Sequence, residues 1–197
     1  MGFTSKQLAD MQQRLTGGAE SKPTSIKYDG SQIVLGVDPS LRGTGYGVIN
    51  TSKSTPTTLA QGTIKCHSSW PMSRCFLEIS NTLEDIIRET NPTVAAIEGL
   101  FFAQNIKTAL VMGQARGAAL TVITKAGLDA FEIAPRKVKQ AIVGFGGAQK
   151  EAVAKMVQTR LGLSTTPSPD AADALAIALA FNQSAAALIP DSAIKPL

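Results

Sequence analysis

Residues 33–50 read IVLGVDPSLRGTGYGVIN, an apolar run that ends in an acid and is followed by a glycine-rich turn and a second apolar run. The first run, residues 33–38, has the length and composition of a buried strand. Residues 39–45 predict a turn, and residues 46–50 predict a second strand that pairs antiparallel with the first. This hairpin places Asp38 at the carboxyl end of a buried strand.

The chain after this hairpin alternates strands and helices. Hairpins that come first and strand–helix units that follow predict an α/β fold, with a mixed five-stranded sheet and helices on both faces. The strand at 94–98 again ends in an acid, Glu98. The further strands are expected at 59–65, 94–98 and 130–133, and the helices at 72–90, 104–126, 135–143, 149–161 and 169–181.

Composition predicts one globular domain with two appendages. The chain has 197 residues, of which 44% are hydrophobic and 17% charged, and no apolar run approaches the roughly 18 residues of a membrane helix. Residues 1–31 read as a flexible N-terminal extension, 32–184 as the folded domain, and 185–197 as a loose tail. With no apolar signal segment at the start, we expect a cytoplasmic protein without a membrane partner.

Residues 169–181 read PDAADALAIALAF, which predicts a helix that is apolar nearly all round and therefore buried. Asp170 and Asp173 lie three residues apart, on one face of this helix. Two buried like charges need a positive charge nearby, and no Lys or Arg lies between Arg160 and Lys195. A bound cation is the first explanation. The alternative is that Asp170 caps the first turn of the helix and interacts favourably with the helix dipole. This explanation accounts less well for Asp173, which lies deeper in the helix.

The two strand-end acids and the two helix acids predict one site. Ligands gather at the carboxyl ends of strands in open α/β sheets, so Asp38, Glu98, Asp170 and Asp173 can form one cluster. No cationic side chain is evident to offset them, so divalent ions are expected. Two Cys and one His are too few and wrongly spaced for zinc, which leaves oxygen ligands and Mg²⁺ or Mn²⁺. Two such ions clamp the attacking and leaving oxygens of a phosphodiester.

Six short segments carry a resemblance to a known family: 33–39, 43–49, 96–98, 113–117, 138–140 and 170–178. In this order they resemble motifs of RuvC-type Holliday-junction resolvases, over about residues 32–182. The resemblance implies a ribonuclease-H-like fold and a homodimer. It also implies an endonuclease of recombination and DNA repair, which uses divalent metal to nick two opposed strands of a four-way DNA junction.

The resemblance also assigns roles to the acids. Asp38, Glu98, Asp170 and Asp173 are the implied catalytic metal ligands, with two Mg²⁺ per active site and Mn²⁺ as a substitute. Asp38 is our choice for the ligand shared by both ions, Glu98 and Asp173 hold one each, and Asp170 completes the shell or orients water. Ser40 stands where the family often has Gly, which removes no ligand.

Basic and aromatic residues predict the DNA contacts. Residues 133–160 carry six basic residues and one acid, an excess that suits a polyanion. Lys139 and Lys150 match family positions near the scissile phosphate. Phe101 matches the position of a base-stacking wedge, although Phe101 and its neighbour could instead both be core residues. The further expected backbone contacts are Arg136 and Lys137.

Partners and rival functions follow from the same features. Paired nicks in a two-fold junction require two active sites, which an isologous dimer supplies. Gly113 and Gly117 form a small-residue stripe that fits either the dimer interface or internal packing. The resemblance suggests a branch-migration helicase complex as a further partner, and a nucleoid-associated location, with an organelle as the alternative. The rival functions are a nuclease for RNA–DNA hybrids and a non-catalytic junction-binding protein.

Overall fold

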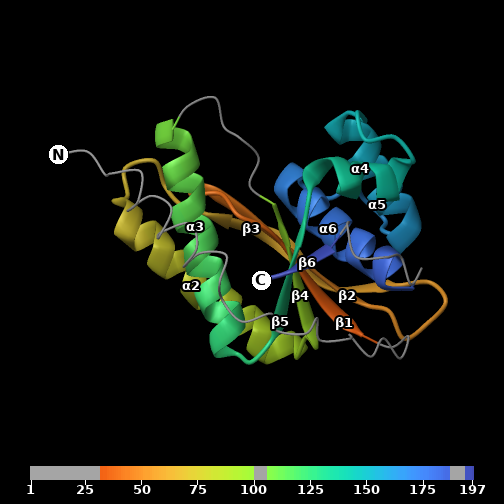
Figure 1. Cartoon of the computed structure of the whole chain (residues 1–197), viewed down its shortest axis with the longest axis horizontal. Coiled ribbons are helices and arrows are strands. Elements are labelled where there is room, and N and C mark those ends of the chain that lie inside the picture. Colours follow the sequence, from red (N-terminus) through yellow and green to blue (C-terminus); the bar gives the residue numbers. More distant parts are fainter. Residues whose placement is uncertain (1–31, 100–105, 187–193) are drawn as a thin grey trace, which may run out of the picture.

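The computed structural model describes residues 32–99, 106–186 and 194–197, which form a six-stranded mixed sheet with helices on both faces (Figure 1). The strand order is β3-β2-β1-β4-β5-β6; β4 runs parallel to β1 and β5, and the other pairs are antiparallel. The strands are β1 (Ile33–Asp38), β2 (Gly43–Asn50), β3 (Thr57–Lys65), β4 (Val94–Glu98), β5 (Asp129–Ile133) and β6 (Ile194–Pro196). The helices are α2 (Met72–Thr90), α3 (Ile106–Lys125), α4 (Pro135–Val143), α5 (Lys150–Leu161) and α6 (Pro169–Ala186).

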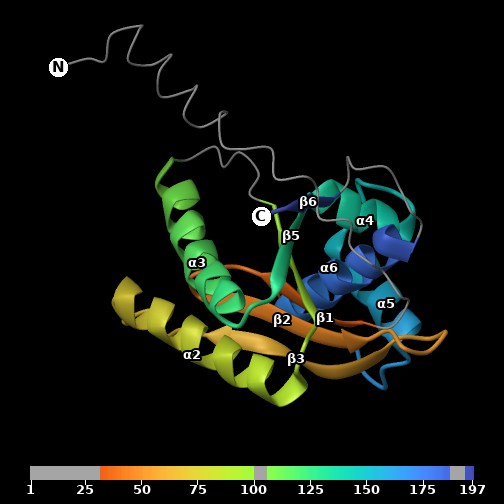
Figure 2. The ribbon, with the colours of Figure 1, turned by 60° about the horizontal axis from the view of Figure 1, so that its bottom comes forward.

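The alternation of strand side chains divides the core into two layers. Leu35 and Val37 point towards α2 and α3, whereas Val34 points towards α4, α5 and α6. The same two layers are visible from the side, with the sheet between the two groups of helices (Figure 2). The predicted α/β class with helices on both faces is therefore confirmed. Residues 1–31 and Phe101 lie outside the described residues.

The chain end differs from the prediction. We expected five strands and a loose tail over 185–197, but α6 continues to Ala186 and residues 194–196 add a sixth strand beside β5. The backbone N–H of Leu197 donates to the carbonyl oxygen of Ala130 at 3.0 Å. The unpaired backbone groups of an edge strand can accept any short extended segment. A strand of three residues has no hydrophobic period to recognise, so the sequence pattern does not reveal it.

Helix α6 lies directly on the backbone of the hairpin. A Cβ atom on Gly36 of β1 would come within 2.1 Å of the carbonyl oxygen of Ala174, and one on Gly45 of β2 within 2.0 Å of that of Asp170. Only residues without a side chain permit this approach, which sets the first two turns of α6 against β1 and β2. Although α6 is strongly apolar, no helix in the described part of the chain is long and apolar enough to cross a membrane.

The contact at Gly36 predicts a large cost for one added methyl group. Gly36→Ala forces α6 away from β1, so we expect a loss of at least about 1–3 kcal/mol in the free energy of unfolding. The matched control is Gly117→Ala in α3, where an added methyl has no neighbour within 4 Å. That change should be neutral or stabilise by about 0.5–1 kcal/mol, because Ala favours helix. Urea unfolding measures both, and equal stabilities for the two variants would contradict the packing argument.

Candidate active site

Two acids lie side by side where the central strands end. Asp38 is the last residue of β1 and Glu98 the last of β4, and the parallel register pairs the residues just before them, Val37 with Ile97. Asp173, in the second turn of α6, reaches the same point. The three carboxylates open on a pocket of about 220 Å³. The pocket is lined by Asp38, Glu98, Pro135, Val138, Lys139, Lys150, Val153 and Asp173.

The carboxyls of Asp38 and Glu98 are hydrogen-bonded to each other. Burial, followed by the charge of Asp38 and the hydrogen bond to it, raises the pKa of Glu98 to about 8. Burial and then the charge of Asp173 also raise the pKa of Asp38, although the bond to Glu98 opposes this shift. The pair therefore retains a proton near neutral pH, and Glu98 donates it to Asp38.

Lys150 offsets part of this negative charge. Its Nζ atom lies 2.6 Å from Oδ2 of Asp173, and this hydrogen bond raises the pKa of Lys150. The expectation that no cationic side chain accompanies the acids was therefore wrong. Lys150 belongs to the first turn of α5, and α5 packs beside α6 on the same face of the sheet. The two residues are 23 positions apart, so their pairing depends on the tertiary structure.

Asp170 lies beside the pocket and does not line it. It occupies the first turn of α6, and its Oδ2 atom sits next to Gly43 at the start of β2. Its charge makes the weakest of the contributions that shift the pKa of Asp38. The structure thus brings together three of the four predicted acids and places the fourth one turn earlier on the same helix.

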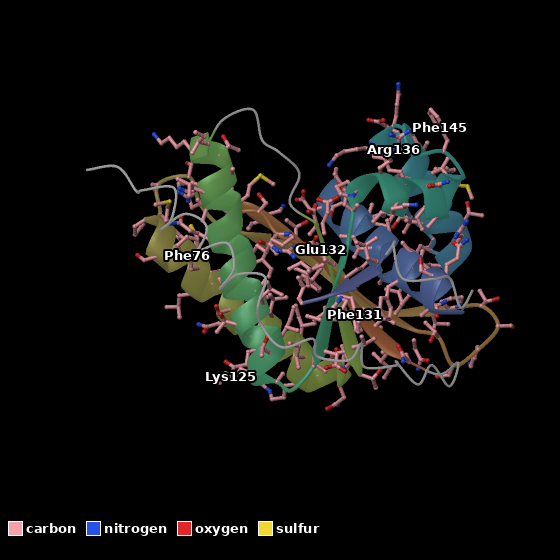
Figure 3. The ribbon with its side chains drawn as sticks, in the orientation of Figure 1. Phe76, Lys125, Phe131, Glu132, Arg136 and Phe145 are labelled. Atoms are coloured by element: carbon pink, nitrogen blue, oxygen red, sulfur yellow. The ribbon has the colours of Figure 1, made fainter. Side chains whose placement is uncertain are left out.

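The predicted DNA-contacting lysines divide into two groups. Lys139 and Lys150 line the pocket with the acids, whereas Arg136 and Lys137 are exposed in the first turn of α4. Figure 3 shows Arg136 projecting from α4 on the outer side of the molecule. The pocket lysines can reach a phosphate at the acids, and the exposed pair can reach only DNA that continues past α4.

Two supporting residues were not predicted as part of the site. Arg116 of α3 is only 6% exposed, and its Nη1 donates to the backbone carbonyl of Glu98. Its Nη2 lies 2.7 Å from Oε2 of Glu132 in β5, labelled in Figure 3. Burial lowers the pKa of Arg116, and the charge of Glu132 opposes that effect. The detectable signal was one arginine among the small apolar residues of a buried helix face.

The donor atoms at the pocket fit a hard divalent cation. Asp38, Glu98 and Asp173 provide carboxylate oxygens, which Mg²⁺ and Mn²⁺ prefer. The raised pKa values of Asp38 and Glu98 reflect burial and repulsion by neighbouring carboxylates, which a bound cation relieves. Within the described residues, no three acidic, His or Cys side chains already surround one point as a metal shell does. Lys150 occupies Oδ2 of Asp173, so a cation that binds this oxygen competes with the lysine.

Comparisons with known proteins point to one family. The sequence model described as "Crossover junction endodeoxyribonuclease RuvC" matches residues 34–181. RuvC of Marinobacter nauticus is 48% identical over 147 residues, which is 75% of this chain and 83% of that protein. RuvC of Chloroflexus aggregans is 42% identical over 146 residues, 74% of this chain and 89% of that protein.

A solved structure agrees with the sequence comparisons. T. thermophilus RuvC in complex with a Holliday junction substrate superimposes with a TM-score of 0.76 and 32% identity, over 84% of this chain and 99% of that chain. Yeast mitochondrial Ydc2, at 12% identity and a TM-score of 0.56, shares the fold alone. The match from β1 to α6 includes every acid of the pocket. The chain belongs to the RuvC family of crossover junction endodeoxyribonucleases.

Proposed function

We propose that this protein resolves four-way DNA junctions by paired nicks, and that Asp38, Glu98 and Asp173 are its catalytic acids. The observation that carries the proposal is one pocket in which these three carboxylates lie beside Lys139 and Lys150. Acids alone fit many metal sites. Carboxylates and lysines at one pocket can bind a divalent cation and a phosphate group at the same time. As a RuvC family member the chain is a metal-dependent endodeoxyribonuclease.

The pocket acids would hold the metal. We assign two Mg²⁺ per site, with Mn²⁺ as a substitute; Asp38 is shared, while Glu98 and Asp173 hold one ion each. When bound, the ions supply activation of water and neutralisation of charge at the phosphate. Asp170, one turn before Asp173, completes the shell or orients water. Lys139 and Lys150 hold the scissile phosphate, and the exposed Arg136 and Lys137 contact the backbone farther along.

A homodimer would supply the second active site. On α3, Ile106 is 79% exposed and Leu110 62% exposed, and Gly117 lies in the same row with no neighbour within 4 Å. Spacings of four and seven residues place the three on one face of the helix. Among the described residues, nothing lies within 4 Å of a Cβ atom added at Gly117, which favours an interface over internal packing as the reason for this glycine. This open apolar row fits a second copy of the chain related by a two-fold axis.

The central test offers the protein three substrates side by side with Mg²⁺: a mobile four-way junction, a fixed junction and an RNA–DNA hybrid. We expect symmetric paired nicks in the mobile junction and an uncut hybrid. Asp38→Asn should lower the cleavage rate more than about 100-fold while junction binding persists, because the shared ligand loses its charge. Near-normal cleavage by Asp38→Asn would refute the metal assignment, and a cut hybrid would favour the rival nuclease.

The pKa of Glu98 predicts how the metal-free protein responds to pH. The pKa of Glu98 is 4.5 in an unfolded chain and about 8 in the fold. The contribution of Glu98 to the free energy of unfolding is therefore complete below pH 4.5 and is lost as the pH rises through 8. In EDTA, the free energy of unfolding should therefore fall across this window, and Mg²⁺ should restore it at pH 8. Glu98→Gln is the control and should show a flatter profile in urea unfolding. An identical slope in that variant would contradict the prediction.

The α3 face predicts the consequence of a charge in the proposed interface. Leu110→Glu should shift the protein from dimer to monomer in sedimentation velocity, because the charge would be buried between two copies. Junction cleavage should then produce single unpaired nicks. Leu59→Glu, at a 46% exposed position on the edge strand β3, is the control and should remain dimeric. A dimeric Leu110→Glu variant would place the interface elsewhere.

A further inference from the structure

The turn between α4 and α5 presents an aromatic ring to solvent. Phe145 is 66% exposed and follows Gly144, which ends α4 in a left-handed conformation with φ of 85°. The turn is closed by a hydrogen bond from the N–H of Ala148 to the carbonyl oxygen of Phe145, at 3.1 Å. An aromatic ring in this position contributes little to the core, and its exposed face is available for stacking.

Two glycines hold the ring and a neighbouring cation in place. A Cβ atom on Gly147 would lie 2.8 Å from Cε1 and Cζ of Phe145, and one on Gly146 would lie 2.6 Å from Cγ of Arg136. The phenyl ring and the arginine stem therefore rest against bare backbone on successive residues. Figure 3 shows both residues near each other on the side of the molecule formed by α4. The arrangement offers a flat apolar surface beside a guanidinium.

The surroundings of the ring favour a nucleic acid over a protein. Residues 135–150 contain the basic residues Arg136, Lys137, Lys139 and Lys150 and no acidic residue. Lys139 and Lys150 line the pocket, while Arg136 and Lys137 are exposed on the side of the turn. Basic side chains therefore lie both at the pocket and, with Arg136, beside the turn that carries Phe145. Phosphates attract such a surface, and the rings of the sugar and base pack on an aromatic face.

We propose that the turn at residues 144–147 is a second DNA contact, in which Phe145 packs against the sugar and base of a nucleotide in the DNA that continues past α4 and Arg136 binds an adjacent phosphate. The inference rests on the proposed function, because the DNA must enter the pocket that the turn adjoins. It adds an aromatic contact on the α4 side of the pocket, separate from the wedge expected at Phe101.

Binding to a four-way junction tests the contact. All variants carry Asp38→Asn, so that Mg²⁺ can be present without cleavage, and fluorescence anisotropy gives Kd. Phe145→Ala should weaken binding about 5- to 150-fold, the range for loss of one stacked aromatic, and Phe145→Tyr should restore it. Arg136→Ala should reduce the salt slope of log K by about one, while Phe145→Ala leaves the slope unchanged.

The controls separate this inference from the proposed function. Leu59→Ala removes an exposed apolar side chain on β3 and should leave Kd unchanged. Thermal unfolding should match wild type for Phe145→Ala, because the ring is exposed. If Phe145→Ala binds as tightly as its parent, the contact is refuted; if it instead changes the oligomeric state, the ring is a protein contact and the inference also fails. A wild type that binds the junction without cutting it would refute the proposed function, while the affinity ratio still decides the contact.

Discussion

The site depends on the contact between the backbone of α6 and the backbones of β1 and β2. With carbonyl oxygens of the helix about 2 Å from where side chains would begin at Gly36 and Gly45, the depth of α6 is set by main-chain atoms alone. Main chain is less adaptable than side chains, so the distance from Asp173 to the strand-end acids has little freedom. The same contact explains why α6 has Ala174 and Ala178 opposite Gly36: a larger residue at these positions would lift the helix and its carboxylate, whereas Leu175 fits over Gly47 of β2.

This rigid arrangement holds negative charges together at a cost in stability. Burial is the largest cause of the raised pKa values of Asp38 and Glu98; the next is the charge of Asp173 for Asp38 and the charge of Asp38 for Glu98. Without a cation, the fold relieves the strain in two ways: Glu98 shares its proton with Asp38, and Lys150 pairs with Asp173. A divalent ion would need the Asp38–Glu98 pair deprotonated, and it would compete with Lys150 for Oδ2 of Asp173. Metal binding at these acids would therefore be linked to proton release.

The local sequence pattern predicted the site residues that lie at strand ends or on one face of a helix. Asp38 and Glu98 each end an apolar run, so the meeting of their carboxylates follows from a parallel pair of buried strands. The apolar helix at 169–181 predicted that Asp173 lies against the sheet, where its side chain is 20% exposed. Contacts between distant segments left no such pattern. Lys150 and Asp173 meet only because α5 and α6 pack together, and Asp170 differs from Asp173 only in depth along the helix. The short β6 strand has too few residues to show alternation.

Glu98 is positioned by helices on both faces of the sheet. Side chains alternate along β4, so the carboxylate of Glu98 faces α6, while Ile97 before it packs towards α2 and α3. The backbone carbonyl of Glu98 accepts a hydrogen bond from Nη1 of Arg116 in α3. Nη2 of the same guanidinium pairs with Glu132 of β5, whose side chain lies on the α3 side of the sheet. Removing Arg116 would leave the carboxylate of Glu132 partly buried without its partner, which is costlier than never having had the pair. Helix α3 therefore fixes the backbone position of Glu98 through Arg116. Helices α5 and α6, on the opposite face of the sheet, supply Lys150 and Asp173 beside its carboxylate.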